Sequence, residues 1–162
     1  MANKPKPALE SAVKKTDEYM TIQEQNELNI RYYSEAMRYL DNANENLKQA
    51  QKDGKIYRDT KYVRSACGIA YSGVLVALEG FLISKGIHTP DSKRVRKSIE
   101  FYQYNLAKLD KKMLDNLTCA YKILHLYGYY DGIQNVNVIK EGFDHAKYIV
   151  NKIKLEEIII NH

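Results

Sequence analysis

The residues best suited to bind a ligand are gathered in the stretch ILHLYGYYDGIQN, residues 123–135. Tyr129, Tyr130 and Asp131 are consecutive there, and His125 lies four residues before the first of them. The fourteen tyrosines of the chain could form stacking platforms for bases, but a tyrosine on a helix edge usually buries its ring and exposes its hydroxyl, and we favour that interpretation. The stretch is a candidate to line a ligand-binding groove.

The same stretch must also reverse the chain between two predicted helices. Gly128 can end the first helix, and Asp131-Gly132 is a turn pair in which glycine can take a positive φ. A hinge does not explain Tyr129 and Tyr130, because two adjacent loop residues do not easily both point inward. We favour a hinge in which one tyrosine anchors the loop and the other faces a groove. An altered or vestigial binding site is the alternative.

Glu79 is a candidate to border the same groove. It lies in the most apolar segment of the chain, residues 66–87, which is long enough to span a membrane. Ser65, Ser72 and Glu79 recur at intervals of seven, so on a helix they form one narrow polar seam. A carboxylate in the middle of a lone span would be costly. We therefore predict the central core helix of a bundle rather than a membrane span.

No other group of residues has the spacing of a catalytic or metal site, and we predict no catalytic residue, metal or cofactor. Cys67 and Cys119 fall on apolar helical stripes, which indicates reduced core thiols rather than nucleophiles or a disulfide. There is no CxxC motif and no glycine-rich phosphate loop. The histidines, of which no two are four residues apart, are His88, His125, His145 and His162.

The composition is that of one soluble globular domain. The 162 residues suffice for a single core, and the hydrophobic share of 44% is ordinary. The net charge of +5 permits a nucleic acid or nucleotide partner without requiring one. The opening MANKPKPALESAVKK has no apolar run after its lysines, so it is not a secretory signal, and we expect a cytoplasmic protein.

Apolar residues at three- and four-residue steps predict an all-α fold, an antiparallel four- or five-helix up-and-down bundle. Residues 1–21 are expected to form a flexible polar tail or a loosely held short helix, and residues 22–162 a single bundle domain. The first helix is predicted over residues 22–53 with Gly54 as its stop, and the second from Asp59 or Thr60 to Gly86.

The third apolar stripe starts after Thr89-Pro90-Asp91, which together are typical of a helix start. It continues to about residue 128 as one very long helix or as two helices with a break near Asp110. We favour the break, because one unbroken helix would overhang its partners. A last helix follows the residue 128–135 loop.

One face of the second predicted helix is made of small residues, which let another helix backbone approach closely. We call this face the small-residue ridge, and its members are Ala66, Ala70, Gly73, Ala77, Gly80 and Ser84. We predict that another helix packs on it.

The segment RSACGIAYSGVLVALEGFLISKGI, residues 64–87, resembles the second helix of HEPN domains and of the related substrate-binding domains that accompany minimal nucleotidyltransferases. The resemblance rests on its alanine-rich, tyrosine-containing start and its closing Lys85-Gly86. Residues 127–153 resemble the last turn and helix of that family. The likeness covers about residues 30–155, and the chain also resembles small bacterial helical proteins of unknown function.

The chain departs from the HEPN ribonucleases in one respect. They carry an arginine and a histidine separated by four to six residues, and none of the six arginines here is followed by a histidine at that distance. Such chemistry needs a cation and an imidazole together. We therefore predict a non-catalytic HEPN-like interaction or ligand-binding module. The alternatives are a divergent HEPN ribonuclease, which Arg64 and His125 in one groove would favour, and a nucleic-acid-binding accessory protein of a nucleotidyltransferase pair.

We expect a homodimer, because the apolar residues exceed what one slender bundle can bury and because HEPN-like domains commonly pair. Ile158, Ile159, Ile160 and the tyrosines of the first helix form the surplus. The resemblance also implies a possible nucleotidyltransferase-type protein partner. Nucleic acid is a weaker expectation, and no membrane association is predicted.

Overall fold

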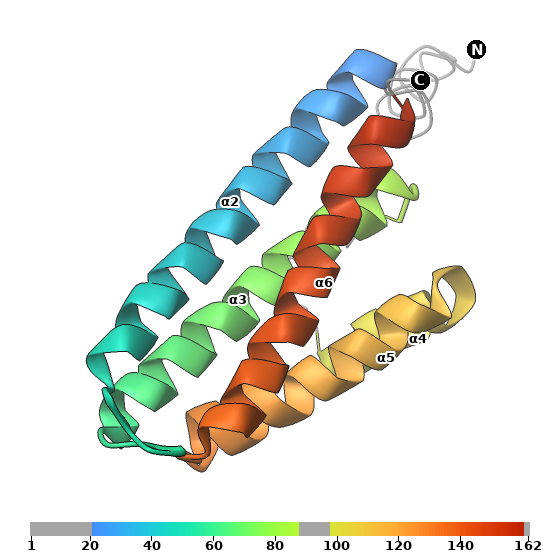
Figure 1. Cartoon of the computed structure of the whole chain (residues 1–162). Helices are drawn as coiled ribbons and strands as arrows, with labels where there is room; N and C mark the ends of the chain where they lie inside the picture. The colour runs from blue at the N-terminus through green and yellow to red at the C-terminus, as the bar shows by residue number, and fades with distance from the viewer. Residues whose placement is uncertain (1–20, 88–97, 161–162) are drawn as a thin grey trace, which may run out of the picture.

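The computed structural model describes residues 21–87 and 98–160, with side chains described as far as Lys154. This part of the chain is an all-α bundle, as predicted. Three long helices lie side by side, and a shorter helical arm packs against two of them, α3 and α6 (Figure 1). The long helices are α2 (Ile22–Gln49), α3 (Thr60–Ser84) and α6 (Val136–Ile160), and the arm consists of α4 (Ile99–Leu109), α5 (Lys111–Ala120) and the π-helix η1 (Tyr121–Tyr130).

Helix α2 begins where the sequence predicts but ends earlier. Thr21 caps it, because its hydroxyl accepts from the Glu24 backbone N–H at 3.1 Å and its own N–H donates to the Glu24 carboxylate at 2.9 Å. The rest of the predicted tail, residues 1–20, lies outside the described residues. The predicted extension of this helix to Asp53 is wrong, since α2 stops at Gln49.

A small antiparallel hairpin replaces the missing end of that helix. Its strands are β1 (Lys52–Asp53) and β2 (Ile56–Tyr57), and Gly54 takes φ +63° in its turn rather than ending a helix. The hairpin is bound to the segment before α6: the Tyr57 N–H donates to the Gln134 carbonyl at 2.8 Å, and the Val136 N–H donates to the Lys55 carbonyl at 2.9 Å. These long-range hydrogen bonds satisfy the backbone that a longer helix would have satisfied locally.

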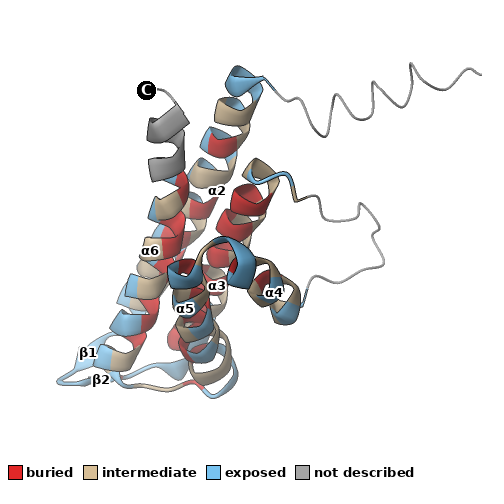
Figure 2. Ribbon diagram, turned by 90° about the vertical axis from the view of Figure 1, so that its right-hand side faces the viewer, coloured by how far each residue is buried: buried red, intermediate tan, exposed pale blue. Residues whose placement is uncertain are grey.

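Helix α3 is the predicted core helix. Asp59 caps it by accepting from the Lys61 N–H at 3.0 Å, and Gly86 follows its end with φ +76°. By length and composition it could cross a membrane, but 61% of its most apolar window is buried inside the bundle. Figure 2 shows that the buried residues of α2, α3 and α6 face one another.

The small-residue ridge of α3 packs against α2, which confirms that prediction. A Cβ built on Gly73 would lie 2.9 Å from the Tyr39 Cβ, and one on Gly80 would lie 2.6 Å from the Tyr32 Cβ. Glycine at these two positions is therefore required by the close approach of the helices.

The break near Asp110 is present, so the alternative of one very long helix is wrong. Asp110 ends α4 and caps α5, and its side chain accepts from the Met113 N–H at 3.0 Å. Its other carboxylate oxygen lies 3.6 Å from the Lys152 Nζ, which ties the break to α6. The predicted start of this region at residues 89–91 lies outside the described residues.

Candidate binding surface on the π-helix

The stretch predicted to be a loop is helical for most of its length. Helix η1 continues α5 without a break and ends only at Tyr130, so the prediction that Gly128 ends a helix is wrong. Its turns are wide, as shown by the Asp131 N–H, which donates to the Leu126 carbonyl five residues back at 3.0 Å. Segments of π-helix are rare and occur frequently at functional sites.

Gly128 is required by packing rather than by chain reversal. A Cβ at this position would clash with the Cys67 Sγ and lie 2.6 Å from the Cys67 Cβ, and Cys67 is fully buried in α3. The chain reverses at Asp131-Gly132, where Gly132 has φ +63° as predicted. The hinge is therefore present, but it is shorter than expected and follows the two tyrosines instead of containing them.

Arg64 of α3 fixes the last turn of η1. Its Nη1 donates to the Tyr130 carbonyl at 2.5 Å and to the Tyr129 carbonyl at 3.3 Å. These carbonyls lie at the C-terminal end of a helix, where backbone acceptors lack partners within the helix and the helix dipole favours a cation. The guanidinium therefore holds the backbone of both tyrosines in place.

Four tyrosine rings surround the imidazole of His125. The ring of Tyr71 stacks on it with a centroid separation of 4.8 Å, and the centroids of Tyr121 and Tyr129 lie 5.3 and 6.0 Å away. The Tyr130 ring meets it edge-on at 5.0 Å. We call Tyr71, Tyr121, His125, Tyr129 and Tyr130 the His125 cluster.

The wide turn of η1 and one glycine of α3 make this arrangement possible. In a helix closed by i→i+5 hydrogen bonds, residues four and five apart share one face, so Tyr121, His125, Tyr129 and Tyr130 come together. A Cβ on Gly68 would lie only 2.9 Å from the Tyr129 ring. Glycine at position 68 thus lets that ring lie directly against α3.

The cluster is closed on the side of α3 and open on the other. Tyr71 is buried, whereas Tyr129 and Tyr130 are 46% and 59% exposed. Burial lowers the pKa of His125, and the same effect raises the pKa of Tyr71. Burial therefore disfavours the charged forms of both His125 and Tyr71. Neither His125 ring nitrogen is bonded to another described residue, and the residue as a whole is partly exposed.

The structure brings together only some of the predicted site residues. His125, Tyr129 and Tyr130 are in contact, and Asp131 is exposed directly after them. Glu79 lies eleven residues beyond Gly68 on α3, about 16 Å along the helix axis. Burial is the main cause of the raised pKa of Tyr32, and the Glu79 carboxylate raises it further. Glu79 is not part of the cluster.

Sequence reasoning missed Gly68 and Tyr71 as members of this surface, and it named Arg64 only as a partner of His125 in the ribonuclease alternative. A signal was present, because these three residues are spaced at i, i+4 and i+7 and so lie on one face of α3. Their partners are 50 or more residues away in the chain, which is why the local pattern around Tyr129 does not reveal them.

The arrangement offers binding groups but few reactive ones. Arg64 reaches the last turn of the helix that carries His125, but its guanidinium is bonded to backbone carbonyls. Burial raises the pKa of Cys67 to about 12, so this thiol is protonated and a poor nucleophile. Within the described residues no group of three or more His, Cys, Asp or Glu side chains could hold a metal ion.

These observations define the class of the protein: it is a compact helical bundle with an exposed, neutral aromatic surface. The chain belongs to the family DUF5618, described as a domain of unknown function, which matches residues 31–155 and so includes the whole His125 cluster. A solved structure of a protein of unknown function from Dyadobacter fermentans is 35% identical, with a TM-score of 0.69, and the match covers 85% of this chain and 99% of that one. No curated protein matches the chain.

Proposed function

We propose that this protein is a non-catalytic binding module that holds a planar ring, such as a nucleobase, against Tyr129 and Tyr130. The supporting observation is that two large aromatic side chains are exposed yet fixed. Arg64 binds their carbonyls, Gly68 seats the Tyr129 ring, and His125 contacts both rings. A surface that is ordered before binding loses less entropy on binding.

The position of His125 restricts where the ligand can lie. The imidazole fills the centre of the cluster, so there is no aromatic cage for a cation. The planes of the Tyr129 and Tyr130 rings are inclined at 72°, so a planar ligand would stack on the outer face of one ring and meet the other edge-on. Base–aromatic stacking contributes about 1–3 kcal/mol per base.

The polar groups beside the rings indicate which bases suit the surface. Neutral His125 has one acceptor and one donor nitrogen, and the Asp131 carboxylate next to Tyr130 accepts hydrogen bonds only. We therefore expect bases with an exocyclic amino group, such as adenine and cytosine, to be preferred to uracil. A binding role without catalysis agrees with the absence of the Arg–His motif and with the hydrogen bonds that tie the Arg64 guanidinium to backbone carbonyls. The resemblance to HEPN domains stays a prediction.

Replacing Tyr129 and Tyr130 together by Ala is expected to weaken adenosine binding roughly 10- to 100-fold, because stacking on one or both rings is lost. Titration calorimetry or NMR measures the change. The matched control is Tyr104→Ala, since Tyr104 is 63% exposed on α4 outside the cluster.

Two further variants separate a site from a hinge. Phe at positions 129 and 130 keeps the rings and should keep most of the affinity. Gly68→Ala displaces the Tyr129 ring without removing it and should weaken binding. If the double Ala variant binds adenosine as the wild type does while Tyr104→Ala does not, the binding surface lies elsewhere.

We also propose a homodimer, supported by Ile22 and Ile30, which are 64% and 46% exposed on α2. Light scattering at micromolar concentration should then give about twice 18.8 kDa, and Ile30→Glu should return the mass to that of a monomer. A wild-type mass near 18.8 kDa would contradict the dimer. A nucleotidyltransferase-type partner, nucleic acid binding and cytoplasmic location stay predictions.

A further inference from the structure

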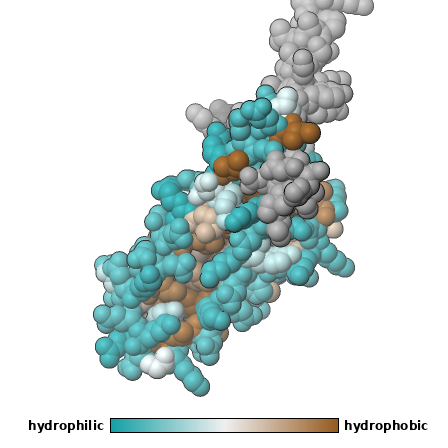
Figure 3. Space-filling view, turned by 45° about the horizontal axis from the view of Figure 1, so that its top comes forward, coloured by the Kyte–Doolittle hydropathy of each residue, from teal (hydrophilic) through white to brown (hydrophobic). Residues whose placement is uncertain are grey.

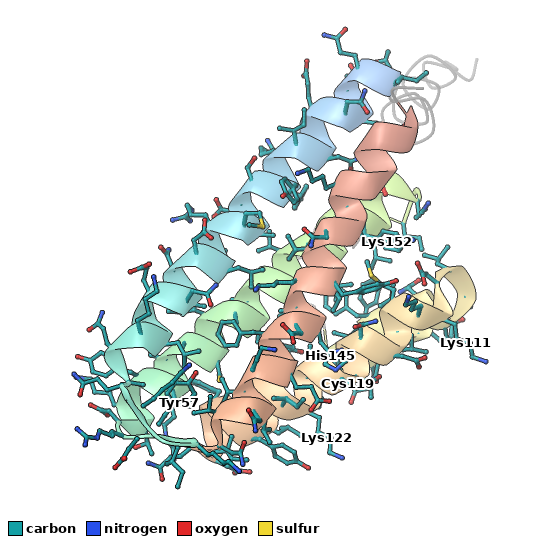
Figure 4. The ribbon with its side chains drawn as sticks, viewed as in Figure 1. Tyr57, Lys111, Cys119, Lys122, His145 and Lys152 are labelled. Carbon is teal, nitrogen blue, oxygen red and sulfur yellow. The ribbon has the colours of Figure 1, made fainter. Side chains whose placement is uncertain are left out.

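A second concave region lies away from the His125 cluster. It is a groove of about 570 Å³ between the C-terminal half of α2, the hairpin and the N-terminal half of α6, and no residue of α3 or η1 lines it. Figure 3 shows a band of hydrophobic surface between hydrophilic residues on the face where α2 and α6 lie side by side, and Tyr57 marks the hairpin end in Figure 4. The volume is in the range of small-molecule sites.

The floor of the groove is apolar and its hairpin wall is fixed. The floor is lined by Leu47, Tyr57, Val136 and Phe143. Of these, Tyr57 and Phe143 are almost fully buried. The wall is anchored by the Gln134 Nε2, which donates to the Tyr57 carbonyl at 2.8 Å, in addition to the backbone hydrogen bonds of the hairpin. An apolar ligand body would therefore meet a formed surface.

The rim of the groove is strongly basic. Four lysines line it, and Asp144 is the one carboxylate among the lining residues. The lysines are Lys48, Lys52, Lys140 and Lys147. Lys48 pairs with Glu45 at 2.9 Å, and Lys140 lies 3.8 Å from Asp144. Lys52 and Lys147 are exposed and form no ion pair with any described residue. Their charges favour an anion at the groove.

We propose that this groove binds a small amphipathic carboxylate, with an unbranched or aromatic apolar body on the floor and its charged group among the rim lysines. An apolar floor with a few polar groups that set orientation is the usual composition of a small-molecule site. Ammonium groups on flexible stems can follow a carboxylate at the edge of such a groove. The groove thus adds a second ligand site to the aromatic surface of η1.

Decanoate is the probe for this proposal, titrated into the full chain below its micelle concentration and followed by calorimetry and NMR. It should bind with saturation at one site per chain. Decan-1-ol should bind much more weakly and decylammonium should not bind, because the rim discriminates by charge. Added salt should weaken decanoate binding.

Variants test whether the rim lysines are responsible. Lys52→Gln with Lys147→Gln should weaken decanoate binding roughly tenfold. The control is Lys111→Gln with Lys122→Gln, which makes the same change in net charge on the α5–η1 side of the molecule (Figure 4) and should leave binding unchanged. All four lysines are exposed, so neither variant removes a core contact.

Three results would overturn the proposal. The first is no decanoate binding at millimolar concentration, and the second is equal binding of decanoate and decylammonium. The third is an equal loss of affinity in the two lysine pairs, since that would trace the effect to net charge and not to the groove.

Discussion

Gly73→Leu is expected to lower the free energy of unfolding by about 1–3 kcal/mol or more, because it places four carbon atoms where two helices touch. A Cβ alone would lie 2.9 Å from the Tyr39 Cβ and 3.2 Å from the Ala36 carbonyl oxygen, and Ala36 is fully buried. Neither neighbour is the free end of a flexible side chain. To accept leucine, α2 would have to move away from α3.

Denaturant and thermal unfolding measure this effect. Ser72→Leu is the matched control, since Ser72 is the adjacent residue on α3 but is exposed, and a surface substitution of this kind usually changes stability by less than about 0.5 kcal/mol. If Gly73→Leu unfolds like the control, α2 does not pack on the small-residue ridge.

Gly128→Ala should also destabilise the protein by about 1–3 kcal/mol, although alanine is the better helix former. The added methyl group would meet the buried Cys67 side chain on one side and approach the Ile123 carbonyl oxygen to 3.2 Å on the other. Helix propensity alone predicts the opposite sign, a gain of roughly 0.5–1 kcal/mol. The direction of the change therefore decides between packing and propensity.

A second substitution identifies the clash. In a Cys67→Ala background the sulfur is gone, so Gly128→Ala should cost less than it does in the wild type, and the two changes should not add. Gly54→Ala is a useful comparison, because Gly54 has φ +63° but no atom within 4 Å of a Cβ. The Gly54→Ala variant measures the cost of backbone strain at a positive φ in the absence of steric crowding. Full additivity of the pair at 67 and 128 would contradict the proposed contact.

The sequence predicts helices well where local signals and packing agree. Asp59 and Gly86 bound α3 correctly, and Asp110 breaks the third stripe, because each forms its own cap or turn. The predicted end of α2 is wrong because local signals and packing disagree there. Gly54 suits a helix stop and a hairpin turn equally, and the choice depends on hydrogen bonds to residues 134–136, which no local pattern reveals.

The π-helix could not be predicted for a similar reason. Its wide turn coincides with contacts to α3, where Gly128 lies on Cys67 and Arg64 binds the last carbonyls. Of the surface itself, His125, Tyr129 and Tyr130 could be predicted because they are close in sequence. Arg64, Gly68 and Tyr71 share one face of α3, but their contact with these residues depends on how α3 packs and is not visible in the local sequence.

The most direct test of the proposed function is NMR of the protein with isotope-labelled tyrosine and histidine rings during titration with adenosine. The account predicts saturable shifts of the Tyr129, Tyr130 and His125 ring signals with one common dissociation constant, and no shift at Tyr104, with uridine causing smaller changes. Unchanged Tyr129 and Tyr130 signals at millimolar adenosine, or equal shifts at Tyr104, would contradict it.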